Sequence, residues 1–195
     1  MRLDAVPKGP GQLAAIDADT KALGFSMGSD PCTGSFLRTV AASKSRGTLL
    51  ELGTGTGIAT SWLLEGMDGQ STLVSVDNDA KLVSVARRHL GHDPRVTFVV
   101  SDGGSFLIQR KAEGRHFDLV FADAWPGKYS HLDEALELVA PGGLYVVDDM
   151  LPQPNWPPDH QPRCDALVEN LSNRPGFRVT ALNWSTGLIV AARSS

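Results

Sequence analysis

The sequence predicts an α/β fold: a seven-stranded, mostly parallel sheet with one antiparallel strand and with helices on both faces. Segments typical of strands alternate with helical segments of roughly ten residues, which indicates βαβ units. The strand segments are nearly continuous apolar runs, as expected when helices cover both faces of a sheet. Only Ser185, Thr186 and Gly187 lie at the junction of the last two strands, too few for a helical crossover, so these strands should form a hairpin.

The chain is expected to begin with an N-terminal arm, residues 1–30, which contains one amphipathic stretch at 13–23. Residues 33–43 place Phe36 and Leu37 on one helical face, which predicts a helix. The alternating pattern follows. The predicted strands are 47–52, 71–77, 95–102, 117–123, 144–149, 177–184 and 186–194, and the predicted helices between them are 58–66, 80–90, 104–114, 131–140 and 162–173.

Local signals support the ends of several elements. Asp79 stands where the N-cap of helix 80–90 is expected, and Gly91 follows that helix. A Pro-Gly-Gly sequence should end helix 131–140. Residues 151–162 form a Pro-rich loop at the sheet edge where α/β folds bind ligands. Three residues of this loop could contact a substrate or only shape the turn: Asn155, Trp156 and His160.

The composition is that of one globular domain. The chain has 195 residues, of which 42% are hydrophobic and 21% charged, and a net charge of −4. Without a basic stripe, no nucleic-acid partner is expected. Cys32 and Cys164 form neither a CxxC pair nor a disulfide framework, which fits a reducing compartment. The start has no apolar signal region and the chain has no apolar run of about 18 residues, so we expect a cytoplasmic protein without a membrane partner.

A glycine-rich loop, "LLELGTGTGIAT" at 49–60, follows the first strand of the alternating pattern. The dinucleotide fingerprint requires a third glycine where this chain has Ile58, and the loop lacks the lysine of a phosphate-binding P-loop. Glu51 lies two residues before Gly53, where a carboxylate would face the ligand and repel phosphate. The loop therefore favours a ligand with a positive charge.

Acidic residues stand at four successive strand ends: Glu51, Asp77, Asp102 and Asp123. Asp77 is 24 residues after Gly53, the usual place for an acid that binds ribose hydroxyls. Each aspartate alone could equally be a helix cap, but their shared placement favours a ligand role. Asp79, by contrast, reads as a cap. The pattern indicates a nucleoside with a positive charge and without phosphates.

These motifs resemble the class I methyltransferases that use S-adenosylmethionine. "LLELGTGTG", "LVSVDND" and "VVSDGG" are similar to the family's glycine, ribose and adenine motifs, and the resemblance covers about residues 27–193. It implies one Rossmann-like methyltransferase domain over 1–195 with strand order 3-2-1-4-5-7-6. It also implies the following cofactor-binding residues: Met27, Ser29, Glu51, Gly53, Thr54, Gly55, Gly57, Asp77, Asn78, Asp102, Gly103, Asp123 and Trp125.

Residues 117–150 resemble the metal-dependent O-methyltransferases of the catechol and caffeoyl-CoA type. The resemblance implies a divalent cation held by Asp123, Asp148 and Asp149, and oxygen ligands suit Mg²⁺, or Ca²⁺ and Mn²⁺. Such an ion would chelate a vicinal diol and lower the pKa of a phenol. The implied acceptor is a hydroxyl group of a small catechol-like molecule, and a homodimer is left open.

The chain departs from this family at two places. Asp149 stands where the family usually has asparagine, and Pro126 stands where it usually has the catalytic lysine. Lys128 is then the candidate catalytic residue, with a solvated loop lysine as the alternative; His131 and His160 are further candidates. Trp125 either packs against the cofactor or is an ordinary core or surface tryptophan.

Three other functions compete with small-molecule O-methylation. Some relatives methylate hydroxylated uridine in tRNA, although the acidic charge opposes that reading. The loss of the usual lysine leaves room for a protein that binds S-adenosylmethionine without catalysis. A nicotinamide-dependent dehydrogenase is disfavoured by Glu51 and by the glycine spacing.

Overall fold

The computed structural model describes residues 8–153, 156–157 and 159–195, and Asn155 and the first seven residues of the arm lie outside this part. The fold is a seven-stranded sheet in the order β3-β2-β1-β4-β5-β7-β6. Strands β1 to β5 pair in parallel, and β7 pairs antiparallel with both β5 and β6. The predicted sheet, strand order and closing hairpin are confirmed.

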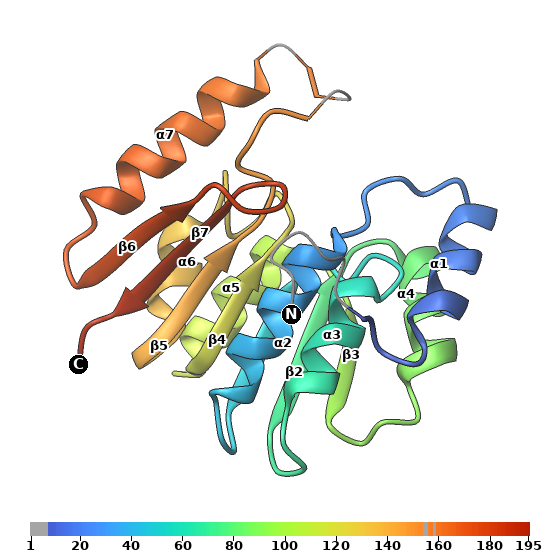
Figure 1. The fold of residues 1–195 in the computed structure, drawn as a ribbon. Coiled ribbons are helices and arrows are strands. Elements are labelled where there is room, and N and C mark those ends of the chain that lie inside the picture. Colours follow the sequence, from blue (N-terminus) through green and yellow to red (C-terminus); the bar gives the residue numbers. More distant parts are fainter. Residues whose placement is uncertain (1–7, 154–155, 158) are drawn as a thin grey trace.

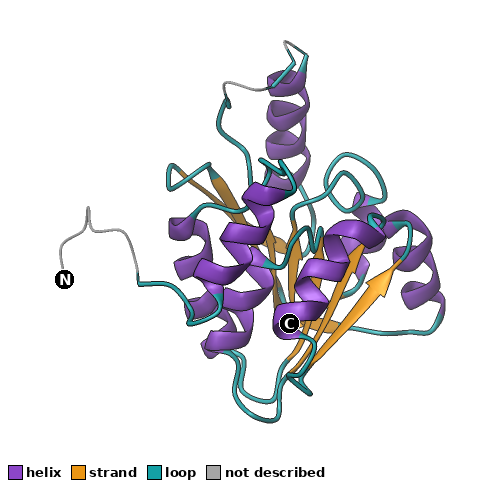
Figure 2. Ribbon diagram, turned by 90° about the vertical axis from the view of Figure 1, so that its right-hand side faces the viewer, coloured by secondary structure: helices purple, strands orange, loops and turns teal. Residues whose placement is uncertain are grey.

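The strands of the sheet are β1 (Thr48–Leu52), β2 (Thr72–Asp77), β3 (Val96–Val100), β4 (Phe117–Ala122), β5 (Val139–Val147), β6 (Phe177–Leu182) and β7 (Leu188–Arg193). The described helices are α1 (Leu13–Ala22), α2 (Pro31–Ala42), α3 (Ile58–Gly66), α4 (Ala80–Leu90), α5 (Gly103–Ala112), α6 (Leu132–Glu137) and α7 (His160–Ser172). Helices lie on both sides of the strands (Figure 2). Among the described helices, none is both long enough and apolar enough to cross a membrane.

Two hydrophobic cores lie on opposite faces of the sheet because side chains alternate along each strand. Leu49 belongs to the core beneath α1 to α4, whereas its neighbour Leu50 belongs to the core beneath α5, α6 and α7. Both leucines are fully buried. Figure 1 shows α1 beside α4 at one end of the sheet and α7 at the other, outside β6. The amphipathic stretch of the arm is thus a helix packed onto the domain.

The boundary between α6 and β5 differs from the prediction. Helix α6 ends at Glu137, and Val139 already pairs with Phe117 of β4. Pro-Gly-Gly interrupts the strand pairing instead of ending a helix, because Gly142 takes a positive φ of 74° and the register shifts there. A long helix over 131–140 was therefore wrong.

Candidate active site

The glycine loop joins β1 to α3 at the carboxyl edge of the sheet. Its three glycines have positive φ values, 100° at Gly53, 52° at Gly55 and 94° at Gly57, which side chains strongly disfavour. A Cβ on Gly53 would lie 2.5 Å from the backbone oxygen of Asp123, and one on Gly57 would lie 2.9 Å from Ala86 Cβ. Two of these glycines are therefore needed for contacts within the protein, not only for a ligand.

Glu51 is fully buried beneath this loop. Its Oε2 accepts hydrogen bonds from Thr60 Oγ1 and Ser75 Oγ, each at 2.5 Å, whereas Oε1 has no partner among the described residues. Burial is the main cause that raises the pKa of Glu51 to about 7, against the two hydroxyl hydrogen bonds that lower it. The carboxyl group therefore lies under the loop. The sequence pattern had instead predicted that it would face the ligand.

Thr54 is also turned inward. Its hydroxyl lies 2.6 Å from Ser75 Oγ, and its side chain is buried. The loop backbone is held by the next strand, because Gly53 N and Thr54 N both donate to the carbonyl oxygen of Val76. Any contact of Thr54 with a ligand would thus use its backbone.

Asp77 ends β2 directly beside the glycine loop. Its Oδ2 accepts a hydrogen bond from Gly55 N at 2.8 Å, and its Oδ1 accepts one from Asp79 N at 2.9 Å. The neighbouring Asn78 is exposed. Asp79 caps α4 by accepting from Lys81 N and Leu82 N, as predicted. Asp77 is therefore fixed with its carboxylate at the loop, where it can accept hydrogen bonds from hydroxyl groups.

Asp102 is the N-cap of α5, since its side chain accepts from Ser105 N at 2.8 Å. The backbone hydrogen bond from Ser105 is the main cause that lowers the pKa of Asp102. The side chain is exposed and lies on the same sheet edge as Asp77. A cap and a ligand role are compatible at this position, because a carboxylate oxygen has more than one lone pair.

Asp123 follows β4 next to the glycine loop. Ser29 Oγ donates to Asp123 Oδ2 at 3.2 Å, which brings the segment before α2 to this strand end. A Cβ on Gly103 would lie 3.0 Å from Pro126, so the loop after β4 packs against the start of α5. The predicted site residues Met27 and Trp125 are exposed by 71% and 50%, and both remain open to a ligand.

Lys128 is buried, so the alternative of a solvated loop lysine is wrong. Its exposure is only 6%, and its Nζ donates to the backbone oxygen of Asp148 at 2.7 Å. A tight turn directs it inward: Gly127 N donates to Ser130 O, and Gly127 has a φ of 92°. Lys128, two residues after Pro126, therefore lies inside the protein at the ends of β4 and β5.

Asp148 and Asp149 follow β5, opposite Asp123. Asp148 Oδ1 accepts hydrogen bonds from Thr33 Oγ1 at 3.3 Å, from Thr186 Oγ1 and from Asp149 N at 2.8 Å. Asp149 has a positive φ of 56°, an uncommon backbone conformation that aspartate tolerates better than most residues. Protein donors therefore already occupy one oxygen of Asp148.

The predicted metal ligands do not fit a divalent cation in this arrangement. Across residues 8–153, 156–157 and 159–195, no group of three or more His, Cys, Asp or Glu side chains could hold a metal ion. Burial, followed by the charge of Asp149, raises the pKa of Asp148 to about 6. Burial, followed by the charge of Asp148, raises the pKa of Asp123 well above its usual range. The charge of Lys128 lowers both pKa values in return.

A chain of hydroxyl groups around Asp148 was not predicted. Thr33 Oγ1 lies 3.0 Å from Ser185 Oγ, which donates to Asp30 Oδ1 at 2.9 Å. Asp30 in turn caps α2 through Cys32 N. The Asp-Pro start of this helix is visible in the sequence, but its contact with the β6–β7 turn joins residues more than 150 positions apart.

Aromatic side chains gather beside Lys128. Tyr129 lies 4.9 Å from Trp125 between ring centroids, and its hydroxyl is 3.2 Å from His160 Nε2 and 3.1 Å from Cys164 Sγ. Trp156 lies 4.1 Å from His160. His131 instead lies against Gly104 of α5. The turn after β4 and the start of α7 thus form an aromatic wall next to the acidic residues.

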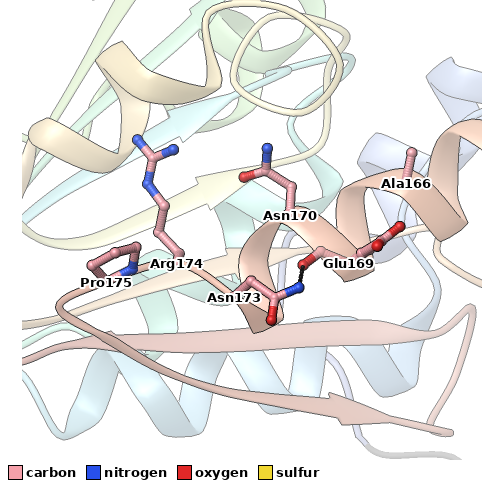
Figure 3. Close-up of a pocket in the computed structure, with 6 residues that line it drawn as sticks. All are labelled: Ala166, Glu169, Asn170, Asn173, Arg174 and Pro175. Atoms are coloured by element: carbon pink, nitrogen blue, oxygen red, sulfur yellow. Dashed lines mark hydrogen bonds between the residues drawn. The ribbon is translucent and has the colours of Figure 1, made fainter.

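Of two surface pockets, one includes Lys128 and the other includes no predicted site residue. Figure 3 shows a pocket on α7 and the turn that follows it, without any predicted site residue; it is lined by Ala166, Glu169, Asn170, Asn173, Arg174 and Pro175. A second hollow between the turn after β4 and α7 includes Lys128 and Tyr129. The acids at the strand ends line neither of these two hollows.

Comparison with known proteins agrees with this geometry. Residues 49–143 match the family described as a methyltransferase domain. A relative from Mycolicibacterium vanbaalenii, whose name gives it a provisional O-methyltransferase assignment, is 31% identical over 121 residues, 60% of this chain. The matched part spans only 53% of that curated relative's length.

Solved structures share the whole fold. An O-methyltransferase from Bacillus cereus in complex with SAH has a TM-score of 0.83 at 22% identity, over 98% of this chain and 94% of that one. Cofactor-bound Rv0187 from MTB has a TM-score of 0.81 at 27% identity, over 94% and 90% of the two chains. Together with the strand order, these likenesses show that the chain has the Rossmann-like fold of these methyltransferases, and its residues 49–143 are similar to the methyltransferase domain family.

Proposed function

We propose that the chain is an S-adenosylmethionine-dependent O-methyltransferase that acts on a hydroxyl group of a small, catechol-like acceptor. The single observation that carries this proposal is the contact between Asp77 and the glycine loop, at the edge that also carries Asp123 and Lys128. This arrangement supports a nucleoside site beside a charged, partly buried site for the acceptor. The family match over 49–143 and the cofactor-bound structural neighbours support the same activity.

The residues present fit S-adenosylmethionine better than a phosphate-bearing cofactor. Asp77 can accept hydrogen bonds from ribose hydroxyls, and exposed Asn78 and Asp102 stand next to it on the adenine side. When it is ionised, the Glu51 carboxylate beneath the loop would supply negative potential, which suits the methionyl ammonium and the sulfonium. S-adenosylmethionine supplies an electrophilic methyl group when it is bound.

The chain's own residues would position and activate the acceptor. The acceptor oxygen forms a bond to the methyl carbon while the carbon–sulfur bond breaks, so positioning in line is the main requirement. Lys128 Nζ, held by Asp148 O, would stabilise the developing oxyanion, and the hydroxyl proton would pass to partly exposed Asp149. The divalent cation implied by the resemblance has no part in this proposal, because the described residues contain no group of three acidic, His or Cys side chains that could hold it as they lie.

The cofactor is tested by calorimetry with S-adenosylhomocysteine and NADH in parallel. We expect binding of the first and none of the second; the reverse would show a nicotinamide enzyme. The activity is tested by transfer of a labelled methyl group to catechol, caffeate and bulk tRNA. Transfer to tRNA alone would overturn the acceptor class, and tight cofactor binding without transfer to any acceptor would favour a non-catalytic protein.

A further inference from the structure

We propose that Lys128 is the resident cation of this acidic site and that the site works without a divalent metal ion. The chelation test of this proposal rests on the proposed O-methylation, because it measures methyl transfer, whereas the metal-binding test does not. It separates this chain from the metal-dependent enzymes that its sequence resembles. Three observations carry it: where Lys128 lies, how the carboxylates are occupied, and how the turn is built.

Lys128 is placed inside the protein by its surroundings. Lysine is rarely buried to this degree unless its charge is paired, and here the exposure is 6%. Its Nζ donates to Asp148 O at 2.7 Å and lies 5.4 Å from the centre of the Tyr129 ring. Both contacts suit a cation, the second through the negative face of the ring.

The turn that carries Lys128 is constrained on both sides. A Cβ on Gly127 would lie 2.5 Å from Leu52 Cδ1, so this turn is pressed against the end of β1. Tyr145 donates its hydroxyl hydrogen to Gly127 O from the neighbouring strand β5. The lysine is therefore held at the strand ends by the fold and does not swing freely to solvent.

The carboxylates are arranged around hydrogen-bond donors instead of a metal ion. Asp148 Oδ1 faces the hydroxyls of Thr33 and Thr186, and Asp123 Oδ2 faces Ser29 Oγ. These bonds occupy one oxygen each of Asp148 and Asp123. A divalent ion at their other oxygens would be repelled by the ammonium group of Lys128, whose charge already acts on both aspartates. Removal of the ammonium would leave Asp123, Asp148 and Asp149 without their nearby cation.

The test is Mn²⁺ binding, measured by electron paramagnetic resonance on the purified full chain. We expect weak binding by the wild type and by Lys128→Arg, which keeps the charge, and at least about tenfold tighter binding by Lys128→Met. Lys111→Met is the matched control, because Lys111 pairs with Glu137 on the surface, and it should match the wild type. Wild-type binding as tight as that of Lys128→Met would overturn the proposal.

Chelation provides a second readout that needs no variant to fold. Methyl transfer by the wild type in EDTA should stay within about twofold of its rate with added Mg²⁺, whereas a metal-assisted site would lose far more. A loss of more than about tenfold that Mg²⁺ restores would overturn the proposal. If no acceptor is methylated under either condition, the proposed function fails, and wild-type Mn²⁺ affinity still decides the role of Lys128.

Discussion

The two halves of the sheet edge are built in different ways. In the half formed by β1 to β3, which we propose binds the cofactor, backbone N–H groups donate to the carboxylates of Asp77, Asp79 and Asp102. In the half formed by β4 and β5, which we propose binds the acceptor, Asp148 is held by hydroxyls from α2 and from the β6–β7 turn. The first half is thus specified by short motifs, and the second by contacts between distant segments.

The strongest test of the motif-built half is Gly53→Val. The new side chain would meet Asp123 O, and valine would have to adopt the positive φ of 100° that Gly53 has. We therefore expect a loss of more than about 3 kcal/mol in the free energy of unfolding. Gly69→Ala is the control, because a Cβ there meets nothing within 4 Å, and it should change stability by less than about 0.5 kcal/mol. Urea unfolding measures both variants, and a stable Gly53→Val would show that the loop adapts.

Glu51→Gln tests the buried charge beneath the loop. Because the folded-state pKa is raised from 4.5 to about 7, the contribution of Glu51 to stability is fully present below pH 4.5 and is lost as pH rises through 7. A shift of this size corresponds to about 3 kcal/mol. We expect the variant to lose less stability than the wild type between pH 5 and pH 8, by denaturant unfolding of the ligand-free protein. Equal losses would mean that Glu51 ionises normally.

Thr186→Val tests the contact-built half. Loss of the hydroxyl leaves Asp148 with one donor fewer in a buried place, at a cost of about 1–3 kcal/mol. If Asp148 positions Lys128, the variant should lower the kcat of methyl transfer by a larger factor than it raises KM. The control is Thr97→Val, because the Thr97 side chain is exposed on β3. This variant should leave kcat and KM unchanged. Unchanged kcat in Thr186→Val would remove the positioning role.

The smallest effect is expected at Asp102, and it distinguishes a cap from a ligand. Asp102→Asn keeps the acceptor for Ser105 N, so its stability should stay within about 0.5 kcal/mol, whereas Asp102→Ala should lose about 1 kcal/mol. Calorimetry with S-adenosylhomocysteine then reports the ligand role. An affinity unchanged in both variants would leave Asp102 as a cap alone.

The acids at the strand ends are visible in the sequence, but the direction in which some of them point is not. Glu51 was expected to face the ligand, yet Thr60 and Ser75 hold it below the loop. Both partners are ordinary polar residues in a helix and a strand, so no motif marks them. Lys128 could be nominated from its distance to Pro126, but its burial depends on the turn at Gly127 and on Leu52.

The alternation of strands and helices, the closing hairpin, the glycine loop and the row of acids at the strand ends can all be predicted from the sequence. These features follow from burial periodicity and local backbone geometry, which act within a few residues. The contact of Asp148 with Thr33, 115 residues away in the chain, and the burial of Lys128 against the backbone oxygen of Asp148 depend instead on how the whole chain packs. Such contacts arise when separate segments are packed together, and their energies depend on burial that no short stretch of sequence contains.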